Sequence, residues 1–523
     1  MGVVIMSTMN KKRGTMKQDT KTTVNHSESK VHKLNALESL FARVLGSFFG
    51  ESTYYEKRSA EQDFKDTQAL ISQVSNNDIE YVLKIAQIGR EYNMISYPLA
   101  LLTICFNDDR FKGTNSKLKV YSDRIIRRGK DILDTMAMQL SMYGKPLPMQ
   151  FRKCLKYKLE TFNDYQLSKS LGKNKDVSLA TCIRLLRPNP KTAKVSKDFF
   201  KRVLDNEVSF GDGVEQVQSA ISKVNNTNNT TTKEDIIKSL DTSSVMAIVK
   251  NLVALYNQGV LLDSEAVKKI TDKLTNKREV EKSKLLPFRF YSAYTEVLKL
   301  NSFRYKIDII DALVKALDLS IYNLKNIDGY NAILIDRSGS MNHKVSSASG
   351  VTADIVACML GAICFKKGNA DVFVFGSSCH QVSGLSRKST VLDIMKSIMG
   401  VSVGCTTYLD RAVNFLFSHG VKYDGLIILS DNDCYSEGKY GFEFDSDMEI
   451  NRLFDRKIIK KVFLNNLLGN TFAIVNTDDY RKNLITGFSE RIVDVINVYS
   501  TLGNKASDIR KVIDSIYGNL PKR

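Results

Sequence analysis

The sequence predicts a multidomain protein in which an all-α region of helical repeats, residues 34–328, is followed by an α/β doubly wound domain, residues 329–523. Two observations carry this prediction. From residue 34 to about residue 328, apolar residues recur at helical spacing. Near residue 331 the pattern changes to short continuous apolar runs, which are typical of strands buried on both faces of a parallel sheet.

The first 33 residues differ from both regions. They are rich in Lys, Thr, Ser and Asn, and their only apolar cluster is residues 3–6. That cluster is too short for a signal peptide core or a membrane span. We therefore predict a flexible basic tail over residues 1–33.

Successive amphipathic stripes predict the helices of the region 34–328. Prolines lie close to three predicted starts, at Pro98, Pro148 and Pro287, and Ser122 is a candidate cap for another helix. A stretch rich in Asn and Thr, residues 224–233, has almost nothing to bury and is predicted to be a flexible loop. Helices of this kind with short breaks indicate antiparallel helix pairs of the HEAT type.

The first chemically informative stretch is the predicted strand that ends at Asp336. Residues 331–342 read NAILIDRSGSMN, so an apolar run leads into an aspartate followed by Ser338 and Ser340. The carboxyl ends of strands are where α/β sheets place their ligands. One carboxylate and two hydroxyl oxygens on a tight turn suit Mg²⁺ or another hard divalent cation. The alternative is that Asp336 caps a helix and the serines satisfy turn amides.

Two later stretches favour the metal interpretation. A Gly-Cys-Thr-Thr turn at residues 404–407 opens a helical pattern, and a second buried-type strand, residues 425–430, is followed by Asp431. Asp-x-Ser-x-Ser, then Thr, then Asp resembles the metal-ion-dependent adhesion site of a von Willebrand factor type A domain. That resemblance implies a bound cation with one position left open for a partner's carboxylate. The matching positions are Asp336, Ser338, Ser340, Thr406 and Asp431.

Charge is distributed unevenly along the chain. The 523 residues include 76 Lys and Arg and 57 Asp and Glu, a net charge of +19. Residues 1–330 hold 53 of the basic and 37 of the acidic residues, so the excess belongs to the first part. It points to a polyanion, with RNA or DNA ahead of a membrane surface. The eight cysteines include no CxxC pair, which fits a reducing, cytoplasmic setting.

Basic residues of the helical region are predicted to contact RNA phosphates. Acidic partners at helical i,i+4 spacing are expected to be few around them, so the charges should be unpaired. The alternative is an ordinary solvated helix face. Tyr143, Tyr157 and Tyr165 are candidates for stacking unpaired bases. The predicted RNA-binding residues are Arg124, Arg127, Arg128, Lys130, Lys153, Lys156, Lys169, Lys175, Arg184 and Arg187.

Motifs in both regions together resemble the Ro autoantigen, or TROVE-domain, family, over about residues 34–500. The likeness lies in residues 145–148 (KPLP), 165–169 (YQLSK), 182–190 (CIRLLRPNP), 286–289 (LPFR), 336–341 (DRSGSM), 429–433 (LSDND), 461–467 (KVFLNNL) and 487–489 (GFS). The resemblance implies a ring of helical repeats closed by the metal domain. It also implies a basic central hole for single-stranded 3′ ends of misfolded noncoding RNA, and an outer surface for small structured Y RNAs. Two features depart from the family: residues 177–181 contain no histidine, and Thr407 replaces a carboxylate.

Two functions from different classes remain open. In the first, a non-catalytic ribonucleoprotein component binds RNA through its helical repeats, and Mg²⁺ recruits an acidic protein. In the second, the chain is a protein-interaction module whose positive charge keeps it soluble. A metal-dependent nuclease is disfavoured, because phosphodiester hydrolysis usually needs several carboxylates around its ions.

Overall fold

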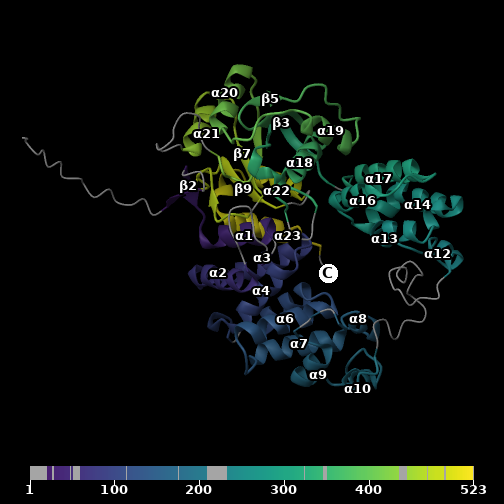
Figure 1. Ribbon diagram of the computed structural model, residues 1–523. Helices are drawn as coiled ribbons and strands as arrows, with labels where there is room; N and C mark the ends of the chain where they lie inside the picture. The colour runs from purple at the N-terminus through teal and green to yellow at the C-terminus, as the bar shows by residue number, and fades with distance from the viewer. Residues whose placement is uncertain are drawn as a thin grey trace, which may run out of the picture.

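The computed structural model describes residues 21–25, 29–47, 49–50, 59–112, 115–172, 174, 176–208, 232–322, 324–345, 350–434, 445–467, 469–487 and 491–521. These residues form three parts. The helical body comprises helices α1 to α10, the arm comprises α12 to α17, and the sheet domain comprises β3 to α23 together with two N-terminal strands. Figure 1 shows the sheet domain above the helical body, with the arm to one side.

The helical body is built from packed helix pairs. Its helices are α1 (Ala36–Gly46), α2 (Ala60–Gln73), α3 (Glu80–Glu91), α4 (Ser96–Asn107), η1 (Asp109–Phe111), α5 (Asn115–Ile125), α6 (Gly129–Met142), α7 (Met149–Thr161), α8 (Asp164–Ser168), α9 (Leu179–Leu186) and α10 (Phe199–Leu204). Helix α4 packs on α3, α6 and α7, and it is buried all round from Tyr97 to Phe106. An apolar surface on every side is what a central helix requires. The repeat architecture predicted from the periodicity is confirmed.

The predicted helix start at Ser122 is wrong. Ser122 lies inside α5, where its hydroxyl donates to the Leu118 carbonyl. The chain breaks at the end of α5, and α6 begins after Arg128, whose N–H donates to Asp131. Asp131 is fully buried and also accepts from Arg90 at 2.7 Å. Asp131 in the first turn is a local signal for this helix start, whereas its bond to Arg90, 41 positions earlier, has no local signal.

The arm is a second, separate set of helix pairs. It contains α12 (Lys233–Ser239), α13 (Val245–Asn257), η2 (Val260–Leu262), α14 (Ser264–Thr275), α15 (Lys277–Ser283), α16 (Pro287–Lys299) and α17 (Lys306–Ser320). Helix α17 packs on α14, α15 and α16. Residues 224–231 of the predicted loop lie outside the described residues, whereas Thr232 caps α12 through the Asp235 N–H. No helix in the described ranges is long and apolar enough to span a lipid bilayer.

The sheet domain is doubly wound, as predicted. Its six strands lie in the order β5-β4-β3-β6-β7-β9, parallel except for β5 at one edge. The strands are β3 (Ile327–Asp336), β4 (Gly368–Phe375), β5 (Cys379–Gln381), β6 (Gly425–Ser430), β7 (Val462–Asn466) and β9 (Lys482–Thr486). The helices are η3 (Gly339–Asn342), α18 (Ala353–Lys367), α19 (Val391–Met399), α20 (Leu409–His419), α21 (Ser446–Asp455), α22 (Ile492–Leu502), η4 (Gly503–Ser507) and α23 (Ile509–Gly518).

Both faces of the sheet are covered, which explains the continuous apolar strands. Along β3, Ile333 and Ile335 join the core formed with α18, α19 and α22, whereas Ala332 and Leu334 join the core formed with α20 and α21. The alternation follows from the two-residue period of side chains along a strand. Neither face is left to solvent along the two central strands, so residues 332–335 of β3 and 426–429 of β6 are unbroken apolar runs.

The predicted flexible tail, residues 1–33, is wrong where the structure describes it. Residues 1–20 lie outside the described residues, but β1 (Thr22–Val24) and β2 (Lys30–Lys33) form a sheet with β8 (Phe472–Ala473). Val31 is fully buried in the core beneath α21. The physical reason is that a strand this short becomes stable only against a partner from the far end of the chain.

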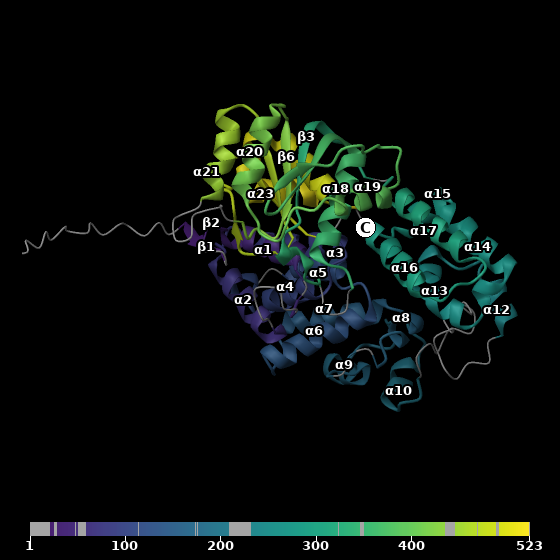
Figure 2. The ribbon, with the colours of Figure 1, turned by 45° about the horizontal axis from the view of Figure 1, so that its top comes forward.

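The sheet domain joins the helical body to the arm. The C-terminal end of α1 lies against the loops after β7 and β9, and α23 packs on α3. On the other side, Asp318 of α17 binds Lys366 of α18 at 2.9 Å and accepts from the Val391 N–H at the start of α19. Figure 2 shows the helical body and the arm as two limbs extending from the sheet domain.

Gly487→Ala is expected to loosen the contact between α1 and the sheet. A Cβ at Gly487, where φ is +115°, would lie 2.6 Å from the Leu45 carbonyl oxygen, so the loss should be on the order of 3 kcal/mol in the free energy of unfolding. Gly384→Ala is the matched control, because its φ is also positive but a Cβ would meet nothing within 4 Å. That control should lose only about 1 kcal/mol. Urea unfolding measures both, and equal losses would contradict the close approach.

Candidate functional site

The predicted metal residues gather at the carboxyl edge of the sheet. Strand β3 ends at Asp336, and its neighbour β6 ends at Ser430, one residue before Asp431. The two strands are parallel and in register, with Ile335 opposite Leu429. Their ends therefore meet at the same level.

Hydrogen bonds hold the turn after β3 in a compact form. The Ser338 N–H donates to Asp336 Oδ1 at 2.9 Å, and the hydroxyls of Ser338 and Ser340 lie 3.2 Å apart. The Ser340 hydroxyl also bonds to the Asp431 carboxyl, which links the two strand ends. Four of the five predicted oxygen ligands are thus brought together.

Thr406 reaches the same region by a different route. The Gly339 N–H donates to the Cys405 carbonyl at 2.7 Å, so the two turns lie side by side. The Thr406 hydroxyl is in contact with the Ser377 hydroxyl, and the Thr406 N–H donates to Ser377 Oγ at 3.1 Å. These contacts place the turn that carries Thr406 against the turn that carries Ser338 and Ser340.

The two carboxyls of the site are fully buried. Burial raises the pKa of Asp336 to about 7, and the negative charge of Asp431 adds to the shift. Burial likewise raises the pKa of Asp431, while its bond to Ser340 opposes the shift. The charge of Asp433 adds to the shift of Asp431. Buried carboxyls whose ionisation is disfavoured create a site that a cation would stabilise.

The donor set fits a hard cation better than a transition metal. No group of three His, Cys, Asp or Glu side chains in the described part of the chain is arranged to hold a metal. The site instead combines two carboxylates with hydroxyl oxygens, which suits Mg²⁺. The buried amide of Asn432, beside Asp431, has no hydrogen-bond partner for either of its polar atoms. Buried polar atoms without partners are rare and point to a missing ligand or water.

Three neighbouring residues were not predicted. The Ser430 hydroxyl donates to Asp336 Oδ2 at 2.7 Å and so orients that carboxylate. Ser377 orients Thr406, and Arg337 binds Asp354 at 2.8 Å while donating to the Met399 and Val401 carbonyls. Both serines follow an apolar strand in the sequence, as Asp336 does, and that position was a usable signal. Arg337 gave none, because its partners are distant in sequence.

In the first group of predicted RNA-binding residues, between positions 124 and 130, three of the four residues lie in ion pairs. Arg127 pairs with Glu91, Arg128 with Asp131 at 2.6 Å, and Lys130 with Asp134 at 2.8 Å. Arg124 donates to the Tyr517 hydroxyl at 2.9 Å. The expectation that acidic partners are few is therefore wrong for residues 124–130. Their contact with RNA stays a prediction. The carboxylates that pair with them reduce the positive charge that they can offer to a phosphate.

The second group is more exposed. Lys153, Arg184 and Arg187 lie at the surface, and no ion pair to any of them occurs among the described residues. Lys156 lies 3.9 Å from Glu160, and the Lys169 ammonium stands 3.6 Å from the centroid of the Tyr165 ring. Lys175 lies outside the described residues. Arg152 and Lys194, which are not among the ten residues predicted above, are also exposed on the same part of the body.

The fold and this edge together define a class of protein. The class is that of proteins in which a helical-repeat region is followed by a doubly wound α/β domain, with carboxylates and hydroxyls gathered at the carboxyl edge of the sheet.

Comparisons with known proteins narrow that class. The family profile described as the TROVE domain matches residues 225–312. The crystal structure of the Ro (RSR) protein of Deinococcus radiodurans matches 92% of this chain and 100% of that chain, with a TM-score of 0.57 and 16% sequence identity. The predicted resemblance to the Ro, or TROVE-domain, family is thereby confirmed.

Other comparisons add little. Two structures of proximal thread matrix protein 1 from the mussel byssus, one with a zinc-occupied MIDAS motif, match 45% of this chain and 57% of theirs. Their sequence identity is 14% and their TM-scores are 0.21 and 0.20, too low to bear on fold or site. None of the curated proteins compared matches the chain.

Asp336→Asn is expected to remove the buried charge while keeping an acceptor for the Ser338 N–H. In EDTA at pH 8 the variant should be more stable than the parent, by as much as about 4 kcal/mol, because the shift spans roughly three pKa units. The folded pKa of about 7 lies above the ordinary value, so ionisation of Asp336 costs stability as pH rises from about 4 to 7. Mg²⁺ should then raise the melting temperature of the parent but not of the variant.

Thermal melts at pH 5 and pH 8, with EDTA and with Mg²⁺, measure both effects. Asp328→Asn is the control, because Asp328 is exposed near the other end of the same strand. A parent indifferent to Mg²⁺, together with a variant no more stable in EDTA, would count against the site.

Proposed function

We propose that this protein binds RNA, as a component of a ribonucleoprotein, through the basic surface formed by α7 to α10. The observation that carries the proposal is local charge. Residues 145–202 contain 15 Lys and Arg against four Asp and Glu, which is more than half of the net charge of the whole chain. A surface with such an excess binds a polyanion by displacing its counterions.

The arrangement of these charges supports the proposal. Arg152, Lys153 and Arg184 are exposed on neighbouring helices, and no ion pair involves them within the described ranges. An unpaired exposed cation neutralises a phosphate at little cost, whereas a cation held by a carboxylate must first break that pair. The basic surface therefore has more unpaired positive charge available to RNA phosphates than residues 124–130 have.

An aromatic side chain accompanies the charge. Tyr157 on α7 is 38% exposed, so part of its ring is accessible to a base. Tyr143 is less available, because it packs against Phe64 with ring centroids 5.8 Å apart. Tyrosine rings beside cationic side chains are typical of surfaces that bind unpaired bases.

The resemblance to the Ro family extends the proposal to RNA classes. Its members take single-stranded 3′ ends of misfolded noncoding RNA and small structured Y RNAs. We assign both classes to this protein as candidate ligands, in a cytoplasmic setting. The match of the TROVE profile and the shared fold support this extension.

The metal site has a binding role in this proposal. Asp336, Ser338, Ser340, Thr406 and Asp431 would hold Mg²⁺ or another divalent cation, which supplies an open position for a carboxylate of an acidic protein. We propose no hydrolysis, since two carboxylates are fewer than a phosphodiester-cleaving metal centre usually has. A protein-interaction module without RNA binding is the competing function, and RNA titration separates the two.

Replacing Arg152, Lys153 and Arg184 by Gln should weaken RNA binding roughly 10- to 100-fold near physiological salt. Each lost phosphate contact removes counterion release, so the slope of log affinity against log salt should fall by about 2 to 3 units. Fluorescence titration of a structured noncoding RNA across a salt series measures both.

A matched control removes the same number of positive charges from a different part of the protein, the sheet domain. Lys388, Lys422 and Lys457 are exposed lysines of the sheet domain, and no ion pair involves them in the described part of the chain. Their replacement by Gln should leave the slope nearly unchanged. Equal effects of the two triple variants would show that only net charge matters, and no binding by the parent at low salt would favour the interaction module.

A further inference from the structure

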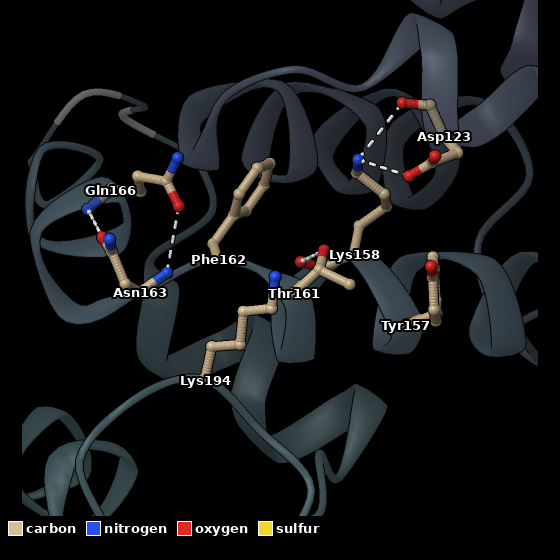
Figure 3. A pocket seen from close by; sticks show the side chains of 8 residues that line it. All are labelled: Asp123, Tyr157, Lys158, Thr161, Phe162, Asn163, Gln166 and Lys194. Carbon is tan, nitrogen blue, oxygen red and sulfur yellow. Dashed lines mark hydrogen bonds and ion pairs between the residues drawn. The ribbon is translucent and has the colours of Figure 1, made fainter. Parts of the chain in front are cut away.

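A pocket opens on the helical body between the end of α7, the start of α8 and the loop that follows α9. Its volume is ≈ 500 Å³, which is within the range of small-molecule sites. Figure 3 shows Phe162 in the middle, the Asn163–Gln166 pair on one side of it, and Lys158 with Asp123 on the other. Lys194 extends from the loop toward Phe162 and Thr161.

The polar end of the pocket presents donors because of how α8 begins. The Gln166 N–H donates to Asn163 Oδ1 at 2.9 Å, and the Asn163 N–H donates to Gln166 Oε1 at 3.0 Å. Each backbone N–H needs an oxygen, so this reciprocal cap fixes which way both amides face. Their NH₂ groups are left to donate to another molecule.

Lys194 is placed by contacts of its own loop. Its N–H donates to the Glu160 carbonyl at 2.9 Å, and the Ser196 N–H donates to Asp164 Oδ1 at 2.8 Å. The side chain of Lys194 is exposed, and no ion pair to it occurs among the described residues. The pocket therefore has one available positive charge beside the two amide NH₂ groups.

The other charges of the pocket cancel. Lys158 is nearly buried and binds Asp123 at 2.8 Å, so neither contributes a free charge. Beside this pair lies Tyr157, and the Lys119 ammonium stands 4.6 Å from its ring centroid. Because this ammonium lies over the ring, a base can stack only on the part of the ring that Lys119 leaves open, and Tyr157 is 38% exposed.

The geometry points to a site for an unpaired nucleotide of RNA, an inference that rests on the proposed function. The base stacks on Tyr157, the phosphate lies at Lys194, and acceptor oxygens of the nucleotide meet the NH₂ groups of Asn163 and Gln166. A duplex cannot use the pocket, because its bases are already stacked and paired. The pocket thus selects single-stranded or looped segments, while the surrounding basic surface binds either form.

Tyr157→Ala tests the stacking contact without changing charge. It should weaken binding of a short single-stranded oligouridine roughly 5- to 150-fold, and leave binding of a short RNA duplex unchanged. The salt slope should stay that of the parent. Tyr480→Ala, at a 44% exposed tyrosine of the sheet domain, is the matched control and should change neither.

Gln166→Glu tests the donor. Glutamate keeps the acceptor that the Asn163 N–H requires, so α8 should retain its start. Its carboxylate replaces the NH₂ group and should weaken single-strand binding more than duplex binding. Gln68→Glu adds the same charge at an exposed position on α2 and should not discriminate between the two RNAs.

The outcomes distinguish failure of the RNA-binding function from failure of the pocket assignment. If the parent binds neither RNA at low salt, the RNA-binding function fails and the pocket assignment fails with it. If the parent binds both RNAs, and Tyr157→Ala and Gln166→Glu bind as the parent does or lose both RNAs equally, only the pocket assignment is overturned. Circular dichroism melts confirm that each variant is folded.

Discussion

The register of β3 against its two neighbours is the constraint on which the candidate metal site depends. β3 pairs in parallel with β4 and with β6, so Asp336 lies opposite Phe375, and Ile335 lies opposite Leu429. Three carboxyl ends therefore meet at one edge, where the end of β3 and the turns after β3 and β6 supply Asp336, Ser338, Ser340 and Asp431, and the loop between α19 and α20 supplies Thr406. A slip of one residue would turn each side chain of β3 to the other face of the sheet. The apolar residues that specify the register thus also place the carboxylate.

The same turn is tied to the attachment of the arm. Arg337 follows Asp336 directly, and its guanidinium joins Asp354 at the start of α18 to carbonyls at the end of α19. The other end of α19 is held by Asp318 of α17. Burial raises the pKa of Tyr291 on α16, and the charge of Asp354 contributes to that shift. The metal turn and the arm therefore share one set of supporting contacts.

Patterns of neighbouring residues in the sequence predicted the features that depend on neighbouring residues alone. The helices of the body and the strand that ends at Asp336 follow from periodicity, and the gathering of oxygen-bearing side chains at the carboxyl edge of the sheet follows from residue type at strand ends. Charge pairing did not follow, because Arg127 meets Glu91 across 36 positions and Arg90 meets Asp131 across 41. The strand at Val31 was missed for the same reason, since its partner in β8 is more than 400 residues away. Sequence spacing predicts which residues are neighbours along one helix. It does not predict which residues of different helices or strands are neighbours in the fold.

The two candidate sites differ in the sign of their charge, and this difference determines what each can bind. The carboxyls at the edge of the sheet are buried, so they act on a cation small enough to reach them and would repel a phosphate. The exposed charges of α7 to α10 are spread over a surface and attract a polyanion of any sequence. Under the proposed function, selectivity for single-stranded over duplex RNA must then come from groups that contact the bases as well as the phosphates. In the basic surface those groups are the fixed amide donors of Asn163 and Gln166 and the ring of Tyr157, which together recognise a base that has left its stack.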